Sequence, residues 1–197
     1  MEYSEYYRAL ALASTRAYGS KIQTGSGGNI SARIAGTKYM IVKSSGGSFA
    51  DCDERGAGFV LTDLNGHTIA GSGKPTKEIF LHSLIYKISG WNAVVHCHSP
   101  WTVAWSLGNT RLPLVTLQAQ LKIGSEVPVL GVKTPVLTER DSGLVEELFI
   151  KNPGQKAFIL SGHGLVALGE DPIAAEQLAE LIEETAQVAC INKLINN

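Results

Sequence analysis

Apolar residues follow two different spacings along the chain, and the two spacings alternate. Short apolar runs bounded by glycine, serine or charged residues predict buried strands. We expect them at residues 30–34, 38–42, 59–64, 67–70, 93–95, 112–117, 127–132 and 156–160. Apolar positions at helical spacing predict helices at residues 4–19, 76–89, 101–107 and 138–152, a brief helix between 117 and 127, and a long closing helix after 171–172. The alternation predicts an α/β fold.

Local signals refine several of these elements. Asn65-Gly66 predicts a tight hairpin turn between two strands. Proline within 112–117 and within 127–132 predicts that both segments are edge strands. The closing helix carries an apolar stripe that predicts a core or subunit contact, formed by Ala174, Leu178, Leu181, Ile182, Thr185 and Val188.

Length and composition place the chain among ordinary globular proteins. Its 197 residues suit a single domain, 1–197, without an internal repeat. No stretch reaches the about 18 apolar residues of a membrane span, and residues 1–5 lack the basic start of a signal peptide. Three cysteines without framework spacing fit free thiols, so we expect a cytoplasmic protein. A formal net charge of −1 argues against a general nucleic-acid binder.

Two histidines end the apolar run that begins at Ala93. Successive side chains of a strand point to opposite faces, so His96 and His98 lie on one face and Cys97 on the other. Two imidazoles aimed at one point suggest a metal, although an isolated histidine is more often an ordinary core or surface residue. We interpret Cys97 as a small core residue.

A third histidine and a glutamate stand at the ends of other elements. His163 follows an apolar strand and has glycine on both sides. Thr76 can cap the helix that contains Glu78, whose carboxylate either complements the helix dipole or faces a cation. Three imidazoles with one carboxylate suit a borderline-soft divalent ion, Zn²⁺ first and Mn²⁺, Fe²⁺ or Co²⁺ after it.

Three loops rich in glycine and hydroxyl residues accompany these positions, at 24–31, 43–47 and 71–75. Such loops can turn several backbone N–H groups toward an anion, but each alone is equally typical of a tight turn. The first loop lacks the lysine of a P-loop.

Together these motifs resemble, in order and over nearly the whole chain, the class II aldolase/adducin family. The resemblance is carried by Gly28-Asn29-Ile30-Ser31, Ser45-Gly46, Lys74-Pro75-Thr76-Lys77-Glu78 with His82, Ala93-Val94-Val95-His96-Cys97-His98-Ser99 and Gly162-His163-Gly164. It implies a three-layer αβα sandwich with a largely antiparallel central sheet. It also implies a homotetramer with sites between subunits, working in sugar metabolism.

The resemblance further implies a role for each motif. The metal ligands would be His96, His98 and His163, with Glu78 as a ligand of the empty metal and as the general acid/base. The substrate phosphate would lie against Gly28, Asn29, Ser45, Gly46, Thr76 and, if it faces the site, Lys77. The activity implied is zinc-dependent retro-aldol cleavage of a small sugar phosphate or sugar acid through a metal-stabilised enediolate.

Two departures from the family pattern leave alternatives open. Lys77 stands where the family has serine, and it either pairs with a substrate anion or points to solvent. Near Leu117 the chain lacks the tyrosine that donates a proton in fuculose-type aldolases. An epimerase, dehydratase or decarboxylase would use the same metal site. A non-catalytic adducin-like interaction domain is the alternative of another class, but it need not retain all four metal-site residues.

Overall fold

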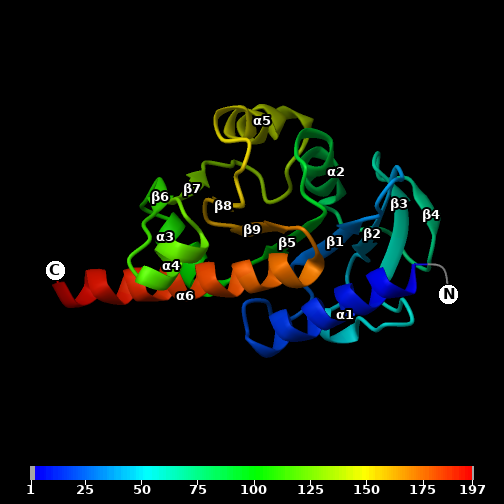
Figure 1. Cartoon of the computed structure of the whole chain (residues 1–197), viewed down its shortest axis with the longest axis horizontal. Helices are drawn as coiled ribbons and strands as arrows, with labels where there is room; N and C mark the ends of the chain where they lie inside the picture. The colour runs from blue at the N-terminus through cyan, green and yellow to red at the C-terminus, as the bar shows by residue number, and fades with distance from the viewer. Residues whose placement is uncertain (1–2, 197) are drawn as a thin grey trace.

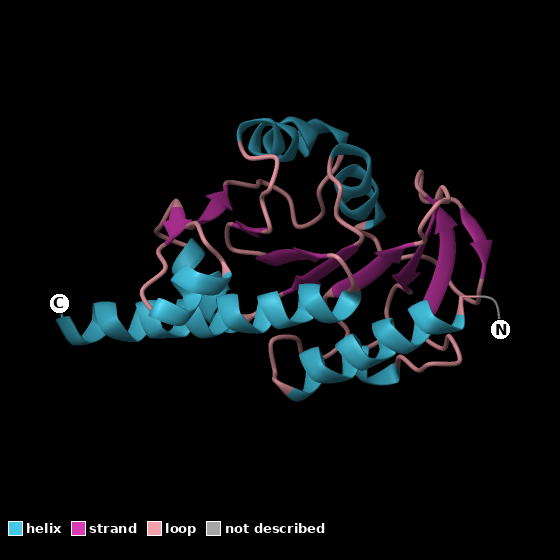
Figure 2. Ribbon diagram, viewed as in Figure 1, coloured by secondary structure: helices cyan, strands magenta, loops and turns pink. Residues whose placement is uncertain are grey.

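A mixed nine-stranded sheet runs through the centre of the part of the chain that the structure describes (Figures 1 and 2). The structure is a computed structural model that describes residues 3–196. Residues 1 and 2, on which the prediction about the start of the chain partly rests, lie outside them. The strand order is β4-β3-β2-β1-β5-β9-β8-β7-β6. Neighbouring strands are antiparallel except β7 and β8, which are parallel. The predicted α/β fold with a largely antiparallel sheet is confirmed.

The elements follow one another along the chain in a pattern close to the predicted one. The strands are β1 (Asn29–Arg33), β2 (Tyr39–Lys43), β3 (Phe59–Asp63), β4 (Thr68–Ala70), β5 (Ala93–Cys97), β6 (Arg111–Leu112), β7 (Val127–Leu130), β8 (Ala157–Leu160) and β9 (Gly164–Gly169). The α-helices are α1 (Ser4–Gly19), α2 (Ile79–Ile88), α3 (Pro100–Ser106), α4 (Leu117–Lys122), α5 (Ser142–Lys151) and α6 (Pro172–Asn196). Short 3₁₀ turns lie at η1 (Phe49–Asp51) and η2 (Glu139–Asp141).

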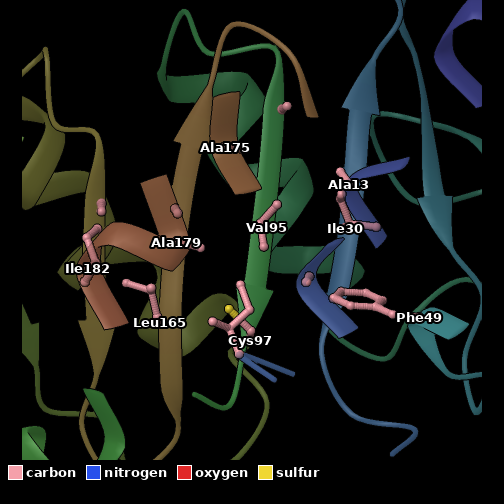
Figure 3. Close-up of a cluster of buried hydrophobic side chains, with 14 of the residues drawn as sticks. Ala13, Ile30, Phe49, Val95, Cys97, Leu165, Ala175, Ala179 and Ile182 are labelled. Atoms are coloured by element: carbon pink, nitrogen blue, oxygen red, sulfur yellow. The ribbon is translucent and has the colours of Figure 1, made fainter. Parts of the chain in front are cut away.

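Helices cover both faces of the sheet, so the molecule has three layers (Figure 1). α1 and α6 pack together on one face, and α2 and α5 lie on the other. The two faces carry separate apolar clusters because strand side chains alternate. Val95 and Cys97 of β5 point into the cluster under α6, as Figure 3 shows. The prediction that Cys97 is a buried core residue is confirmed.

The buried face of α6 is displaced from the predicted stripe, with which it shares only Ile182 and Thr185 among the described residues. Ile182 and Thr185 are buried, but Val188 is 37% exposed. Small residues make up much of this buried face, namely Ala175, Ala179, Ala186 and Ala189. A Cβ at Gly169 of β9 would lie 2.5 Å from the Ala175 nitrogen, so helix and strand approach closely. Close approach favours small side chains, whereas the predicted stripe consisted mostly of large apolar residues.

The segment from 111 to 132 and the strand after His163 depart from the prediction. Residues 112–117 do not form a strand beyond Leu112, and Leu117 begins α4, the brief helix that was expected. β7 is not an edge strand, since it pairs with both β6 and β8. The central strand β9 was not predicted because its glycines at positions 164 and 169 mask a fully buried apolar run. The hairpin at Asn65-Gly66 is confirmed, although its connection spans residues 64–67.

Candidate metal centre

His96 occupies the end of β5 and is fully buried. Its Nδ1 lies 2.9 Å from the backbone oxygen of Leu165 on the neighbouring strand β9. A carbonyl oxygen only accepts hydrogen bonds, so Nδ1 carries the proton and the Nε2 lone pair faces the site. The register between β5 and β9 therefore sets which nitrogen of His96 is available to a cation.

His163 lies in the turn between β8 and β9, and its Nε2 is 3.4 Å from Nε2 of His96. The glycines on either side of His163 allow the backbone conformation and the close backbone contact of this turn. Gly162 adopts φ 65°, and a Cβ at Gly164 would lie 2.5 Å from the Cys97 backbone oxygen. Both positions therefore exclude ordinary side chains.

His98 follows β5 and is held by a residue that the sequence did not single out. The His98 backbone N–H donates to Gln23 Oε1 at 2.8 Å, and Gln23 Nε2 donates to the Thr24 oxygen at 2.6 Å. A Cβ at Gly27 would lie 2.8 Å from His98 Nδ1, so the glycine loop lies directly against the ring. The His96, His98 and His163 ring centroids are 5.0, 4.7 and 4.9 Å apart pairwise, which makes a nearly equilateral triangle.

Glu78 completes the cluster from the start of α2. It occupies the N-cap position, so it is not a first-turn residue as predicted, and Thr76 Oγ1 accepts its backbone N–H at 3.3 Å. Glu78 Oε2 lies 3.2 Å from His96 Nε2, and Oε1 lies 3.7 Å from His163 Nε2. One ligand atom from each of these three residues and His98 lies within 4.8 Å of every other.

The electrostatics of the cluster favour a bound cation. Burial lowers the pKa of His96, His98 and His163, that of His163 to about 4, so the three rings are neutral near pH 7. Burial also raises the pKa of Glu78 to about 7, opposed by a hydrogen bond from Asn29. Glu78 Oε1 and His163 Nδ1 are buried without a hydrogen-bond partner among the described residues. Neutral imidazoles, an acidic side chain and an unpartnered oxygen are the donor set that a divalent transition metal takes.

The first two glycine- and hydroxyl-rich loops and the residues 76–78 that follow the third line a cavity of about 250 Å³ beside Glu78. The loops are joined by backbone hydrogen bonds from Ser45 N–H to the Lys74 oxygen and from Thr76 N–H to the Lys43 oxygen. Every residue expected to contact phosphate lines this cavity: Gly28, Asn29, Ser45, Gly46, Thr76 and Lys77.

The cavity also includes residues for which the sequence predicted no individual role. Pro135 and Val136 close one side, and no motif marks them. Lys43 is buried at the end of β2, with its Nζ 3.3 Å from the Ser44 oxygen, and burial lowers the pKa of its ammonium. Asn29 has a second contact besides the cavity, because its Nδ2 donates to Glu78 Oε2 at 2.7 Å.

The fold and this cluster define a class of protein: a three-layer α/β protein with a candidate metal-binding cluster of three histidines and a glutamate at the ends of its elements. Known proteins are similar to this chain over nearly its whole length. The model of the family described as the Class II Aldolase and Adducin N-terminal domain matches residues 8–190. The chain therefore belongs to this family.

Individual relatives support the same assignment. An L-fuculose phosphate aldolase of Methanococcus maripaludis is 33% identical over 183 residues, which cover 91% of this chain and 92% of that protein. A 3-oxo-tetronate 4-phosphate decarboxylase of Escherichia coli is 29% identical over 174 residues, 85% of this chain and 78% of that protein. The crystal structure of L-fuculose-1-phosphate aldolase from Thermus thermophilus has a TM-score of 0.81 at 27% identity, with 96% of this chain and 94% of that chain covered.

Proposed function

We propose that this chain is a single-domain, metal-dependent carbon–carbon lyase that cleaves a small sugar phosphate or a related sugar acid by a retro-aldol reaction. One observation carries the proposal: His96, His98, His163 and Glu78 converge beside a cavity walled by loops of small residues. The relatives named as fuculose-phosphate aldolases support the reaction type.

Zn²⁺ is the metal we expect, since three neutral imidazoles suit it, with Mn²⁺, Fe²⁺ or Co²⁺ as alternatives. His96, His98 and His163 would hold the ion, and Glu78 would bind it until substrate arrives. When bound, the ion supplies Lewis-acid stabilisation of the negative charge that develops on the substrate oxygens, an effect of several kcal/mol.

The side chains around the metal position supply the remaining steps. Glu78, released toward the substrate, would take the proton from the hydroxyl that becomes the aldehyde carbonyl and return it to the carbon that separates when the C–C bond breaks. Positioned acid/base catalysis of this kind accelerates a reaction by about 10²- to 10⁴-fold. The backbone N–H groups of Gly28 and Gly46, with the Thr76 hydroxyl, hold the phosphate or carboxylate group at the end of the substrate. The exposed Lys77 ammonium at the cavity rim adds a positive charge toward that anion.

The proposal is tested by screening purified, zinc-loaded protein against ketose phosphates and sugar acids and measuring aldehyde release. We expect cleavage that is lost on chelation and restored by Zn²⁺. A protein that binds no transition metal, or a zinc-loaded protein that releases no aldehyde from any of these substrates, would contradict the proposal.

Two variants assign the roles within the site. Glu78→Gln keeps the size of the side chain, and we expect kcat to fall by about 10²- to 10⁴-fold while zinc stays bound. His163→Ala removes a ligand, and we expect zinc affinity itself to fall. Equal zinc affinity in His163→Ala and the parent protein would remove His163 from the ligand set.

Decarboxylation is the second candidate function, with epimerisation and dehydration on the same metal site as further variants. The specific observation that favours it is the absence of tyrosine from the helix at Leu117, together with the Escherichia coli relative named as a decarboxylase. Release of carbon dioxide from a 3-oxo sugar-acid phosphate would identify this activity. An isomeric sugar as sole product would identify an epimerase.

We further propose a cytoplasmic homotetramer with sites between subunits. Large apolar side chains are exposed on α4 and the last turns of α6, namely Leu117, Leu121, Leu194 and Ile195. The three cysteines are free. No described helix has the length and apolar character needed to cross a membrane. Light scattering during size-exclusion chromatography measures the assembly, and a monomeric mass would contradict it.

A further inference from the structure

A line of buried polar side chains extends from Glu78 into the layer between α2 and the sheet. Asn29 and Ser31 come from one face of β1, and His82 and Tyr86 come from successive turns of α2. Asn29 Nδ2 donates to Glu78 Oε2 at 2.7 Å, and Asn29 Oδ1 meets His82 Nε2. Ser31 Oγ lies 2.7 Å from His82 Nδ1 and 2.6 Å from the Tyr86 hydroxyl.

These hydrogen bonds have one consistent direction. A carboxylate only accepts, so Asn29 turns its NH₂ to Glu78 and leaves its carbonyl oxygen for His82. That oxygen also only accepts, so His82 carries its proton on Nε2. His82 is fully buried and contacts no carboxylate in this line, so the ring is neutral and its Nδ1 accepts from the Ser31 hydroxyl. Ser31 in turn accepts from Tyr86.

The geometry points to His82 as a positioning residue that keeps the Asn29 NH₂ turned toward Glu78 and so holds the Glu78 carboxylate at the metal cluster. Without the His82 N–H, the Asn29 amide could rotate and present its oxygen to Glu78, which would repel the ionised carboxylate. The inference deepens the proposed function and rests on it, because it gives His82 a role through the acid/base residue.

The rigid elements around this line explain why histidine suits the position. Residues 29 and 31 share a face of a central strand, and residues 78, 82 and 86 are spaced by one helical turn each. Imidazole offers a donor and an acceptor at fixed positions, so one side chain bridges Asn29 and Ser31. Ser83, the next residue on α2, is also buried, but its hydroxyl has no partner among the described residues.

The first test is the tautomer of His82, which does not depend on activity. In protein with ¹⁵N-labelled histidine, the signal missing from His82→Gln identifies His82 in a long-range ¹H–¹⁵N spectrum. We expect a neutral ring protonated on Nε2. A ring protonated on Nδ1 would overturn the inference, whatever the substrate of the protein proves to be.

The second test is a double-mutant cycle with the zinc-loaded protein. We expect His82→Leu to lower kcat by about 10- to 100-fold with little change in KM and zinc content, as loss of an orienting partner does. His82→Gln, which can still donate to Asn29, should recover most of the loss, and Ser83→Ala should match the parent protein.

The cycle separates positioning from a general effect on the fold. In the Glu78→Gln background, His82→Leu should cause no further loss of kcat, since its effect runs through that carboxylate. An equal loss in both backgrounds would overturn the inference. Should the protein show no lyase activity at all, the proposed function fails, and the tautomer alone decides the role of His82.

Discussion

Gly28→Ala tests how the first glycine loop holds His98. Gly28 adopts φ 64°, and a Cβ there would lie 2.5 Å from Gln23 Oε1, the atom that accepts the His98 backbone N–H. The Gln23 side chain is buried and held at both ends of its amide, so it cannot simply turn aside. The substitution therefore combines backbone strain, a steric overlap and the loss of a hydrogen bond.

The magnitude follows from these three contributions. Left-handed backbone in a residue with a Cβ costs about 1 kcal/mol, overpacking about 1–3 kcal/mol and the lost hydrogen bond about 1 kcal/mol. We expect Gly28→Ala to lower the free energy of unfolding by about 3–5 kcal/mol. Displacement of His98 should also lower zinc affinity by about 10- to 100-fold.

Gly25→Ala is the matched control, because Gly25 lies in the same loop at φ 61° but a Cβ there would meet nothing within 4 Å. It should show the strain alone, about 1 kcal/mol, and unchanged zinc affinity. Urea unfolding of the metal-free proteins gives the stabilities, and competition with a chromophoric chelator gives the affinities. Equal stability and equal zinc affinity in Gly25→Ala and Gly28→Ala would refute the role assigned to the loop.

Three further predictions concern other parts of the chain. The metal-free protein should lose stability as pH falls below 6.5. Burial lowers the pKa of His82 to about 3, whereas in the unfolded chain this side chain binds a proton near the ordinary histidine pKa of about 6.5. Each histidine whose pKa is lowered in this way contributes a loss of up to about 1.4 kcal/mol per pH unit, and the raised pKa of Glu78 offsets the contribution of one histidine. Urea titrations at neutral pH and at about pH 5 check this, and constant stability would contradict it. A thiol reagent should label Cys190 before the two buried cysteines, and equal rates at all three would argue against the described packing. Glu183→Ala should destabilise the fold by about 2–3 kcal/mol, because the Glu183 carboxylate on α6 accepts hydrogen bonds from two backbone N–H groups at the start of α3. Thermal unfolding measures the change in stability. Unchanged stability would show that water replaces the carboxylate at these two N–H groups.

Local patterns were sufficient to single out the four residues that converge in the candidate metal cluster. Strand alternation predicts that His96 and His98 lie on one face, and their ring centroids are 5.0 Å apart although β5 ends at Cys97. The glycines around His163 mark a turn with no room for side chains. The start of α2 was predicted two residues too early, with Thr76 as N-cap, so Glu78 is the N-cap instead of a first-turn residue. Such predictions succeed because they depend on backbone geometry over a few residues.

Only the tertiary structure could decide what lies next to these residues. The register of β5 against β9 brings the Leu165 oxygen to His96, and packing of the first loop brings Gln23 to His98. The strand β9 itself escaped prediction, because glycine weakens the local strand signal while burial between β5 and β8 supplies the stability.

The sequence by itself therefore determined the donor set, three imidazoles and a carboxylate at element ends, because those residue types and spacings are local properties. The tertiary structure decided that they meet within 4.8 Å, which nitrogen of His96 faces the site, and that His82 stands behind Glu78. These features depend on strand order and helix packing between residues about 20 to 85 positions apart, for which no short pattern in the chain carries a signal.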